Sequence, residues 1–402
     1  MNLREYGSMV NQFMTVAGGT IPRQFLDPTL LGNGTDWQHE LFKVTPMIKH
    51  QLSMSGGNDK TTYFMSGEYM NQDGVALGSG FKRYGFRIKV DNKPREWATI
   101  GANLSFNQTD QNLTTSQGDV ISNALQLSPQ VPVKNFDGTW AGADTTNGAN
   151  IFAPVNPIAI SSLTTNTNTN RQFLGDLNIS LKLMKGLTFT TSLNGNVGYT
   201  NSTFYQPTYS IGWAKVVTAT LNNGTGMNTY WNLNQMLQYY KQIGKHTFDL
   251  MASHESQQST WKNVGASRTG FLTNDIFDLS AGDPITANNS GGSGPWAMES
   301  YLGRISYNYD DKYLVVSTLR RDGSANFGSN NRWGLFPSVY AAWRISKEKF
   351  FNVPFISDMK LRFETGTTGN SGGGGIYSAM STGATPTGTG FLPSSYLSLI
   401  HI

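Results

Sequence analysis

The sequence predicts an all-β fold: a transmembrane antiparallel β-barrel of which this chain supplies about twelve strands. Three observations predict it. Side chains alternate between apolar and polar in runs of about ten residues, the runs are joined alternately by short and long connections, and no apolar run is long enough for a spanning helix. A strand of about eleven residues tilted by about 45° crosses about 26 Å, which matches the apolar band of an outer-membrane barrel.

The composition agrees with a β-sheet that has one face in contact with water. Only 14% of the 402 residues are charged, whereas about 25% is usual for a soluble domain. The chain has no cysteine, which excludes disulfides, cysteine-based zinc sites and thiol catalysis. The net charge is +4 without a dense Lys/Arg run, so nucleic acid is not an expected partner.

The stretch from Glu299 to Ile345 shows most clearly the pattern of strands joined by short and long connections. It holds three alternating runs, joined first by the tight turn Asp310–Lys312 and then by the longer Asp322–Asn331 loop. The same alternation of short and long connections runs through most of the chain. The remaining predicted strands are 47–56, 61–71, 80–91, 97–107, 171–183, 187–199, 230–241, 246–257 and 359–367.

The two faces of a strand can be separated by parity. In the strand 80–91, Arg83, Arg87 and Lys89 lie on the face opposite Tyr84 and Phe86. A cation facing lipid at mid-depth costs about 2–4 kcal/mol, so the charged face is predicted to line the lumen. A soluble antiparallel sheet with one wet face would show the same alternation. The lumen-lining candidates are Glu68, Arg83, Arg87, Asp176, Lys182 and Asp249.

Loop lengths assign the two sides of the membrane, because outer-membrane barrels carry long loops outside and short turns in the periplasm. The long connections 108–170, 201–229, 259–298 and 322–331 are therefore expected outside the cell. Exposed aromatic faces stack on sugars, although each such residue could instead pack its own loop. The substrate-contact candidates in these loops are Trp140, Trp213, Trp261 and Trp296, whereas Trp333 and Trp343 are predicted for interface girdles.

Three regions follow from this organisation. Residues 47–370 are predicted to be the partial barrel. Residues 1–46 contain helical patterns, including a turn capped by Thr35 or Asp36, and are expected to be a plug-to-barrel connection or the first extracellular loop. Residues 371–402 are expected to be an extracellular loop with a truncated end, in which residues 397–402 break the pattern and need not be native.

Residues 301–351 resemble the barrel signature of SusC/RagA-type TonB-dependent transporters of the Bacteroidetes outer membrane. The likeness covers nearly the whole chain from Thr35 to Asn370. The motif residues that carry it most densely are Arg320, Arg321, Asp322, Gly323, Ser324, Phe327, Gly328, Trp333, Gly334, Phe336, Pro337 and Ser338.

The resemblance implies a barrel of about 22 strands with an N-terminal plug, energised through TonB and embedded in outer-membrane lipid. It also implies a SusD-like lipoprotein partner and oligosaccharide or peptide substrates, without a cofactor. No signal peptide, TonB-contacting box or plug is recognised here, so the chain is expected to be a barrel fragment. Within the motif, Asp322 and Ser324 are expected to satisfy turn amides, Gly323 to supply a special φ, and the two arginines to leave the membrane rim.

Catalytic patterns are not found. His254–Glu255 lacks the second histidine of a zinc motif, and no nucleophile elbow occurs. The chain is therefore predicted not to be an enzyme and to hold no metal. Two other classes stay open: a passive porin-like or adhesive barrel, and a soluble β-rich glycan-binding domain. The residues do not separate glycan from peptide as the substrate.

Overall fold

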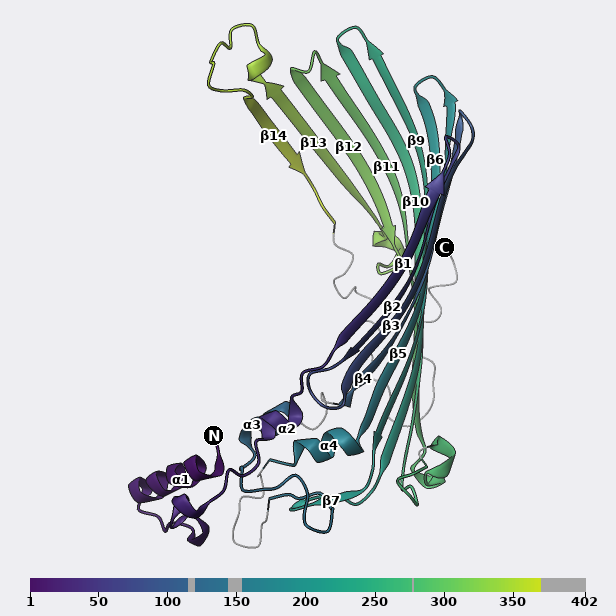
Figure 1. The fold of residues 1–402 in the computed structure, drawn as a ribbon. Helices are drawn as coiled ribbons and strands as arrows, with labels where there is room; N and C mark the ends of the chain where they lie inside the picture. Colours follow the sequence, from purple (N-terminus) through teal and green to yellow (C-terminus); the bar gives the residue numbers. More distant parts are fainter. Residues whose placement is uncertain (115–119, 144–153, 277, 370–402) are drawn as a thin grey trace.

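The computed structural model describes residues 1–114, 120–143, 154–276 and 278–369. Its main feature is one twelve-stranded antiparallel sheet with the order β1-β2-β3-β4-β5-β6-β9-β10-β11-β12-β13-β14. Figure 1 shows a curved, twisted wall that does not close, with β1 and β14 as its edges. The predicted fold class and the predicted number of strands are confirmed.

Each strand pairs with its neighbour in sequence, except that β7 and β8 form a separate hairpin. The strands are β1 Met47–Gly57, β2 Thr61–Asp73, β3 Ser79–Arg95, β4 Ala98–Leu113, β5 Thr165–Met184, β6 Leu187–Gln206, β7 Tyr209–Ile211, β8 Ala214–Val216, β9 Thr220–Ile243, β10 His246–Thr269, β11 Asn288–Tyr309, β12 Tyr313–Ser324, β13 Trp333–Arg344 and β14 Lys360–Gly366. The α-helices are α1 Leu3–Ala17, α2 Trp37–Leu41, α3 Val120–Gln126 and α4 Pro157–Leu163.

The central strands are longer than the sequence predicts. β9 and β10 have 24 residues each, and both continue far into segments that the sequence predicts to be loops. The reason is visible in β9, where Asn222–Asn228 is polar or glycine on both faces apart from Met227. Side-chain alternation disappears there, but backbone pairing with β6 and β10 continues to the end of the strand. Prediction from side-chain alternation therefore ends the strand where its apolar residues end, although the strand itself continues.

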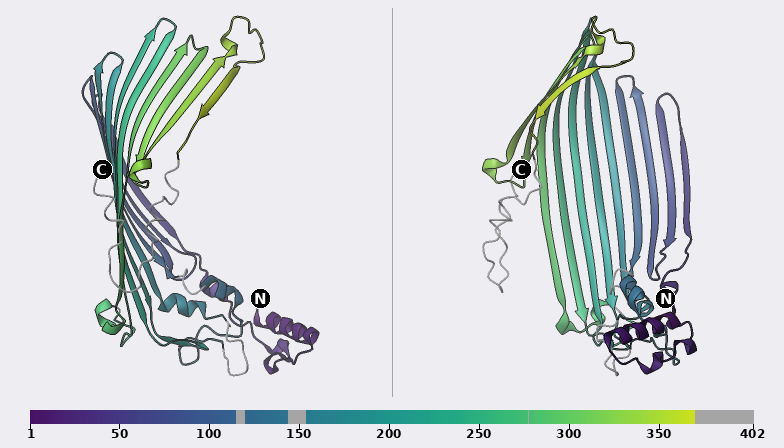
Figure 2. Two further views of the ribbon diagram at one scale, coloured as in Figure 1. Left: turned by 180° about the vertical axis from the view of Figure 1, so that it is seen from behind. Right: turned by 90° about the vertical axis from the view of Figure 1, so that its left-hand side faces the viewer.

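The four α-helices of the described residues gather at the end of the sheet that carries the long connections (Figure 2). A small hydrophobic core lies there, built around buried Trp37, Leu41, Val120, Ala159 and Ile211. Trp37 donates its indole N–H to the Ser128 carbonyl at 3.1 Å, which ties the N-terminal segment to the connection between β4 and β5. The core thus lies at one end of the wall, outside the sheet.

The N-terminal segment 1–46 forms the helices expected of it. Asn2 caps α1 in a reciprocal box with Glu5, and Gly18 ends it with φ +68°. Asp36 caps α2 by accepting from the His39 N–H, so the prediction of a capped turn is correct. Of the described residues, none belongs to a helix that is long and apolar enough to cross a bilayer. The predicted C-terminal region 371–402 lies outside the described residues.

The opposite end of the sheet carries the short turns and an aromatic row. Tyr309, Tyr313 and Trp343 stack with ring centroids 6.3 and 6.5 Å apart. Glu348, in the connection after β13, accepts from the Tyr313 hydroxyl at 2.6 Å, the Lys312 ammonium at 2.9 Å and the Trp343 indole at 3.1 Å. These donors, the Tyr313 hydroxyl first, lower the pKa of the Glu348 carboxyl to about 2.

Candidate functional site: the polar face of the sheet

The register of the sheet separates its side chains into two faces. One face, called here the apolar face, includes Leu104, Phe173, Leu193, Leu237 and Leu250, all substantially exposed. The other face, called the polar face, carries Asn, Gln, Ser, Thr and the charged side chains of the strands. A row of paired positions on it runs through Glu68, Gly85, Asn107, Gln172 and Gly198 across five strands.

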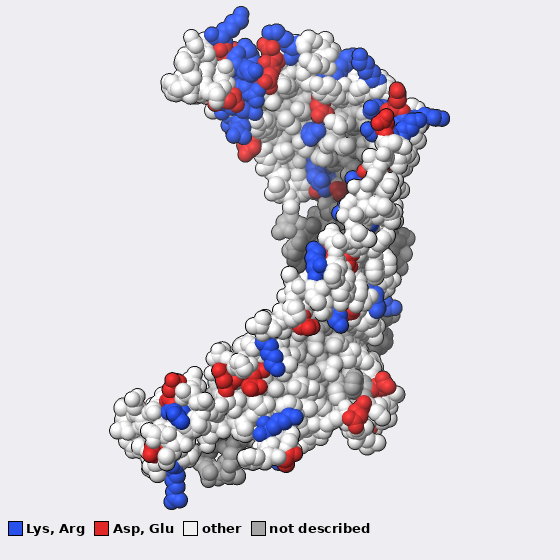
Figure 3. Space-filling view, viewed as in Figure 1, with Lys and Arg blue, Asp and Glu red and all other residues white. Residues whose placement is uncertain are grey.

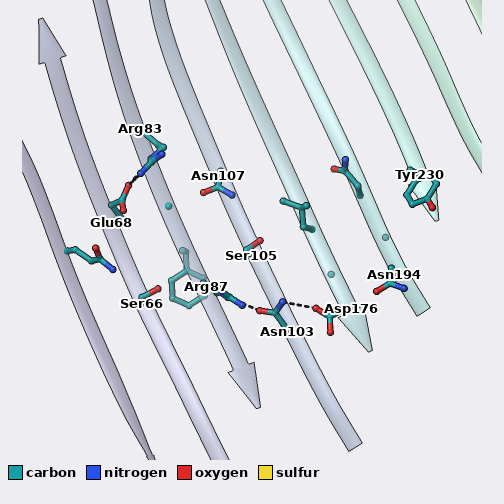
Figure 4. Close-up of a pocket in the computed structure, with 17 residues that line it drawn as sticks. Ser66, Glu68, Arg83, Arg87, Asn103, Ser105, Asn107, Asp176, Asn194 and Tyr230 are labelled. Carbon is teal, nitrogen blue, oxygen red and sulfur yellow. Dashed lines mark hydrogen bonds and ion pairs between the residues drawn. The ribbon is translucent and has the colours of Figure 1, made fainter. Parts of the chain in front are cut away.

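A cavity of about 660 Å³ opens on the polar face over strands β1 to β6 and β9. Four of the six predicted lumen-lining residues meet in it: Glu68, Arg83, Arg87 and Asp176 (Figure 4). The sequence missed its uncharged members, because alternation places an amide on a face but does not show which cross-strand neighbours it has. These members include Asn103, Asn107, Asn194, Asn196 and Tyr230.

Glu68 is the centre of the first charged group in this cavity. Its carboxylate accepts from Arg83 Nε at 2.7 Å and forms a second contact with Arg83 Nη2. Lys49 Nζ lies 3.2 Å from the other carboxylate oxygen. One carboxylate on β2 is therefore shared by cations from both neighbouring strands.

Asn103 links the second charged group. Its amide oxygen accepts from Arg87 Nε at 2.9 Å, and its amide nitrogen donates to Asp176 Oδ2 at 2.6 Å (Figure 4). The amide therefore bridges a cation on β3 and an anion on β5. The result is a surface of alternating donors and acceptors that is suited to hydroxyl and amide groups of a ligand.

The other two predicted lumen residues lie on the polar face but outside this cavity. Asp249 accepts from Gln238 at 2.9 Å and pairs with Arg304 at 3.5 Å. Lys182 is exposed near the short-turn end of β5 and has no ion pair within the described residues. All six candidates thus share one face, but only four share one cavity.

The four tryptophan candidates divide into two pairs. Trp140 and Trp213 lie in connections, as predicted. Trp140 packs against the small core beneath Lys134, whose ammonium is 4.7 Å from the ring centroid, and this favours the packing alternative for Trp140. The prediction that Trp261 and Trp296 lie in a loop is wrong, because both lie inside strands, β10 and β11, on the polar face. The cause is the loss of alternation described for the ends of these strands.

Known proteins resemble this chain in both sequence and fold. No family model matches the sequence. TonB-dependent receptor P26 of Formosa agariphila is 30% identical over 377 residues, which cover 90% of this chain and 36% of the relative. TonB-dependent receptor SusC of Bacteroides thetaiotaomicron is 29% identical over 375 residues, which cover 85% of this chain and 36% of SusC.

The chain is similar to TonB-dependent receptors, SusC among them. It spans about a third of the length of the curated relatives it matches. The solved structure of the RagAB peptide importer in its open-open state has a TM-score of 0.78 to this chain at 22% identity, and the match covers 92% of this chain and 44% of that one. This likeness supports the fold.

The SusC/RagA-type motif around Arg320 forms a charge network, which differs from the expected turn. Residues 320–324 are the last part of strand β12. Arg320 lies on the polar face, where its Nε lies 2.7 Å from Asp322 Oδ1 and its Nη2 donates to Ser300 Oγ at 3.0 Å. Nη2 also lies 3.4 Å from Glu255 Oε2. These contacts do not test the prediction that both arginines leave the membrane rim, which stays a prediction.

Two further expectations for this SusC/RagA-type motif need correction. Asp322 binds Arg320 instead of turn amides, whereas Ser324 does accept from the Asn326 N–H at 3.2 Å. Gly323 lies in the strand and has no left-handed φ. A Cβ at this position would lie 2.9 Å from the Trp333 ring, so the glycine is required by close approach. Arg321 faces the apolar side and stacks 4.6 Å from the Trp333 ring centroid.

Five motif residues line a smaller cavity beside this network. Its volume is about 210 Å³. Of the motif, Asp322, Ser324, Phe327, Gly334 and Phe336 line it. A chain of hydrogen bonds joins the network to the larger cavity: Glu255 accepts from Asn232 at 2.6 Å, and Asn232 accepts from Asn194 at 3.5 Å.

Proposed function

We propose that this chain forms part of the barrel wall of a TonB-dependent outer-membrane importer. The observation that carries the proposal is the two-faced, twelve-stranded sheet in a chain whose curated relatives are named TonB-dependent receptors. The apolar face meets lipid and the polar face lines the transport path. Glu68 and Arg320 on the polar face each have partners of opposite charge, which lowers the cost of placing them in a lumen.

In this proposal the end with α1 to α4 faces the cell exterior and the short turns face the periplasm. Residues 1–46 then act as part of the extracellular assembly, because α2 packs against α3 and α4 at that end. A SusD-like lipoprotein is the expected partner over these long connections. Coupling to TonB is proposed for the whole receptor.

The substrate is proposed to be an oligosaccharide or a peptide. The cavity around Glu68, Arg83 and Asn103 supports this, since it offers amides and paired charges that bind hydroxyls or peptide groups. A peptide is compatible with the fold, because one protein of similar structure is the RagAB peptide transporter. Catalysis is not part of the proposal, because transport explains the polar face without a reacting group.

Uptake by the full-length receptor that carries this segment tests the proposal. Import should stop when the proton-motive force is collapsed or TonB is deleted, and Asn103→Leu should lower uptake while leaving the amount of receptor in the outer membrane unchanged. Import that survives the loss of TonB would contradict it and favour a passive porin-like barrel. Fractionation of the receptor to the periplasm would favour a soluble β-domain.

A further inference from the structure

A group of polar and aromatic side chains interrupts the apolar face at the level where β12 ends and β13 begins. The register places them there, because one row of paired positions joins Leu193 of that face to Glu299 and Trp333. The row runs through Leu193, Leu233, Ser256, Glu299, Gly323 and Trp333. A carboxylate on a face of leucines needs a reason, because a charge that faces lipid is unfavourable.

The level of this row along the strands matches the second rim of an apolar band. Tyr309, in the aromatic row at the short-turn end, follows Glu299 by ten residues of β11. Ten residues at about 3.3 Å each, tilted by about 45°, cross about 23 Å, close to the roughly 25 Å of an outer-membrane apolar band. Charged side chains of both signs gather at the short-turn rim (Figure 3), and Glu299 lies at the opposite one. In the proposed function this opposite rim meets the outer leaflet.

Glu299 is held in place by two neighbours on the same face. Its Oε1 accepts from the Tyr301 hydroxyl at 2.7 Å and lies 3.1 Å from His254 Nε2. The other ring nitrogen of His254 lies 3.2 Å from Gln235 Oε1, so the carboxylate is connected across β9, β10 and β11. Within the described residues, Oε2 of Glu299 forms no hydrogen bond, which leaves this oxygen free to accept from a ligand.

A cavity of about 420 Å³ lies beside Glu299, bordered by Trp231 of β9 and Trp333 of β13. Trp231 donates its indole N–H to Gln258 at 3.3 Å, and the Trp333 ring lies over Gly323, so both rings are positioned by the neighbouring strand. Between the two rings the cavity is lined by the small residues Ser256, Ala297 and Gly323. The two tryptophans are 38% and 40% exposed, so part of each ring can contact a ligand.

Two arginines adjoin this cavity. Arg332 lines it, and the Arg332 Nε is buried without a hydrogen-bond partner within the described residues. Arg321 stacks on Trp333, 4.6 Å from the ring centroid. The acidic residue next to Arg321 in the sequence, Asp322, is bound to Arg320 instead. Both guanidinium groups can therefore bind a phosphate, whose geometry they match.

We propose that this cavity binds the sugar headgroup of a phosphorylated glycolipid whose acyl chains lie on the apolar face. The indole rings contact the apolar face of a sugar ring, Glu299 accepts from its hydroxyls, and the arginines bind its phosphate. The exposed side chains of Ile305, Leu319 and Leu335 continue the apolar face toward the short turns and contact the acyl chains. A free sugar would lack this hydrocarbon contact, and a phospholipid would lack the sugar ring. The inference rests on the membrane location in the proposed function and adds a ligand to it.

Glycolipid binding to the purified full-length receptor tests this inference. Native mass spectrometry in detergent would compare added lipid A, a phosphorylated disaccharide glycolipid, with phosphatidylglycerol. The wild type should retain lipid A preferentially. Trp231→Leu with Arg321→Gln should weaken this binding by about tenfold or more, because the double variant removes one stacking ring and one charge-assisted hydrogen bond. Glu299→Gln should weaken it less, since the amide oxygen still accepts from a hydroxyl.

Tyr199→Leu with Lys262→Gln is the matched control. It removes one aromatic ring and one cation from the same face, in the row of Met227 and outside the cavity. This control should bind lipid A as the wild type does. Equal loss in both double variants would show only general attraction and would overturn the site. So would equal retention of lipid A and phosphatidylglycerol, equally tight binding of glucose 1-phosphate, or a receptor dimer that forms through this face and excludes lipid A.

The outcomes separate this inference from the proposed function. A receptor that imports by a TonB-dependent route but shows no preference for lipid A contradicts the glycolipid site alone. A receptor that never reaches the outer membrane contradicts both.

Discussion

The polar face holds two charge groups of opposite design, one centred on Glu68 and one on Arg320. Glu68 is a single anion held by two cations, and its partners Lys49 and Arg83 are 45% and 37% exposed. Arg320 is a single cation held near two anions, and its partners Asp322 and Glu255 are 18% and 25% exposed. Removing the centre thus leaves well-solvated cations in the first group but poorly solvated anions in the second. The stability of the charge group in the motif is therefore expected to depend more on Arg320 than the stability of the other group depends on Glu68.

The largest effect is expected for Arg320→Leu. It leaves Asp322 and Glu255 without their cation, and it should lower the free energy of unfolding by about 2 kcal/mol, less than for a fully buried pair because Arg320 is about a third exposed. Denaturant unfolding of the full-length receptor in detergent measures it. Arg321→Leu is the matched control, since this neighbour only stacks on Trp333 and should cost about 0.5–1 kcal/mol. An equal loss of stability in Arg320→Leu and Arg321→Leu would contradict the role given to the charge group around Arg320.

Gly323→Ala should cost about 1–2 kcal/mol, because the added methyl group must displace the Trp333 ring that lies against it. The same unfolding measurement applies. Gly303→Ala, in the neighbouring strand β11, is the control: no atom lies within 4 Å of its added Cβ, so little change is expected. A tolerated Gly323→Ala would mean that the motif glycine is not required by packing.

Glu68→Gln should cost less, about 0.5–1 kcal/mol, because water already solvates much of Lys49 and Arg83. Unfolding of this variant beside Arg320→Leu measures the contrast between the two groups directly. If Glu68→Gln proves the more destabilising of the two, exposure of the remaining partners does not set the cost, and the comparison fails.

The smallest effect concerns Glu348, which lies outside the wall and has its partners at the short-turn end. Its pKa is lowered from 4.5 to about 2 in the folded chain, so its stabilisation is fully present above pH 4.5 and is lost as pH falls toward 2. The unfolding midpoint should therefore separate wild type from Glu348→Gln at pH 6, and the two should converge between pH 4.5 and 2. A constant separation across that range would contradict the assignment.

The strands and their two faces are predicted well from the sequence where one face of a strand is apolar. In β3, the parity of Arg83 and Arg87 against Tyr84 and Phe86 is enough to assign both faces, and the register confirms it. Prediction fails where both faces are polar, as at Trp261, because backbone hydrogen bonds hold the strand without any side-chain pattern. It also fails for partners such as Asn103 and Glu255, since pairing across strands depends on register, which local sequence does not carry.

The ends of β9 and β10 that extend past the apolar residues differ from the rest of the sheet in how they tolerate substitution. In the parts of β9 and β10 next to the long connections, the backbone ladder continues although most side chains are polar or glycine. Polar substitutions on the polar face there are expected to cost little stability, because they leave the backbone pairing intact. The fold therefore combines an apolar band, where side-chain pattern and backbone pairing agree, with strand ends that backbone pairing alone extends.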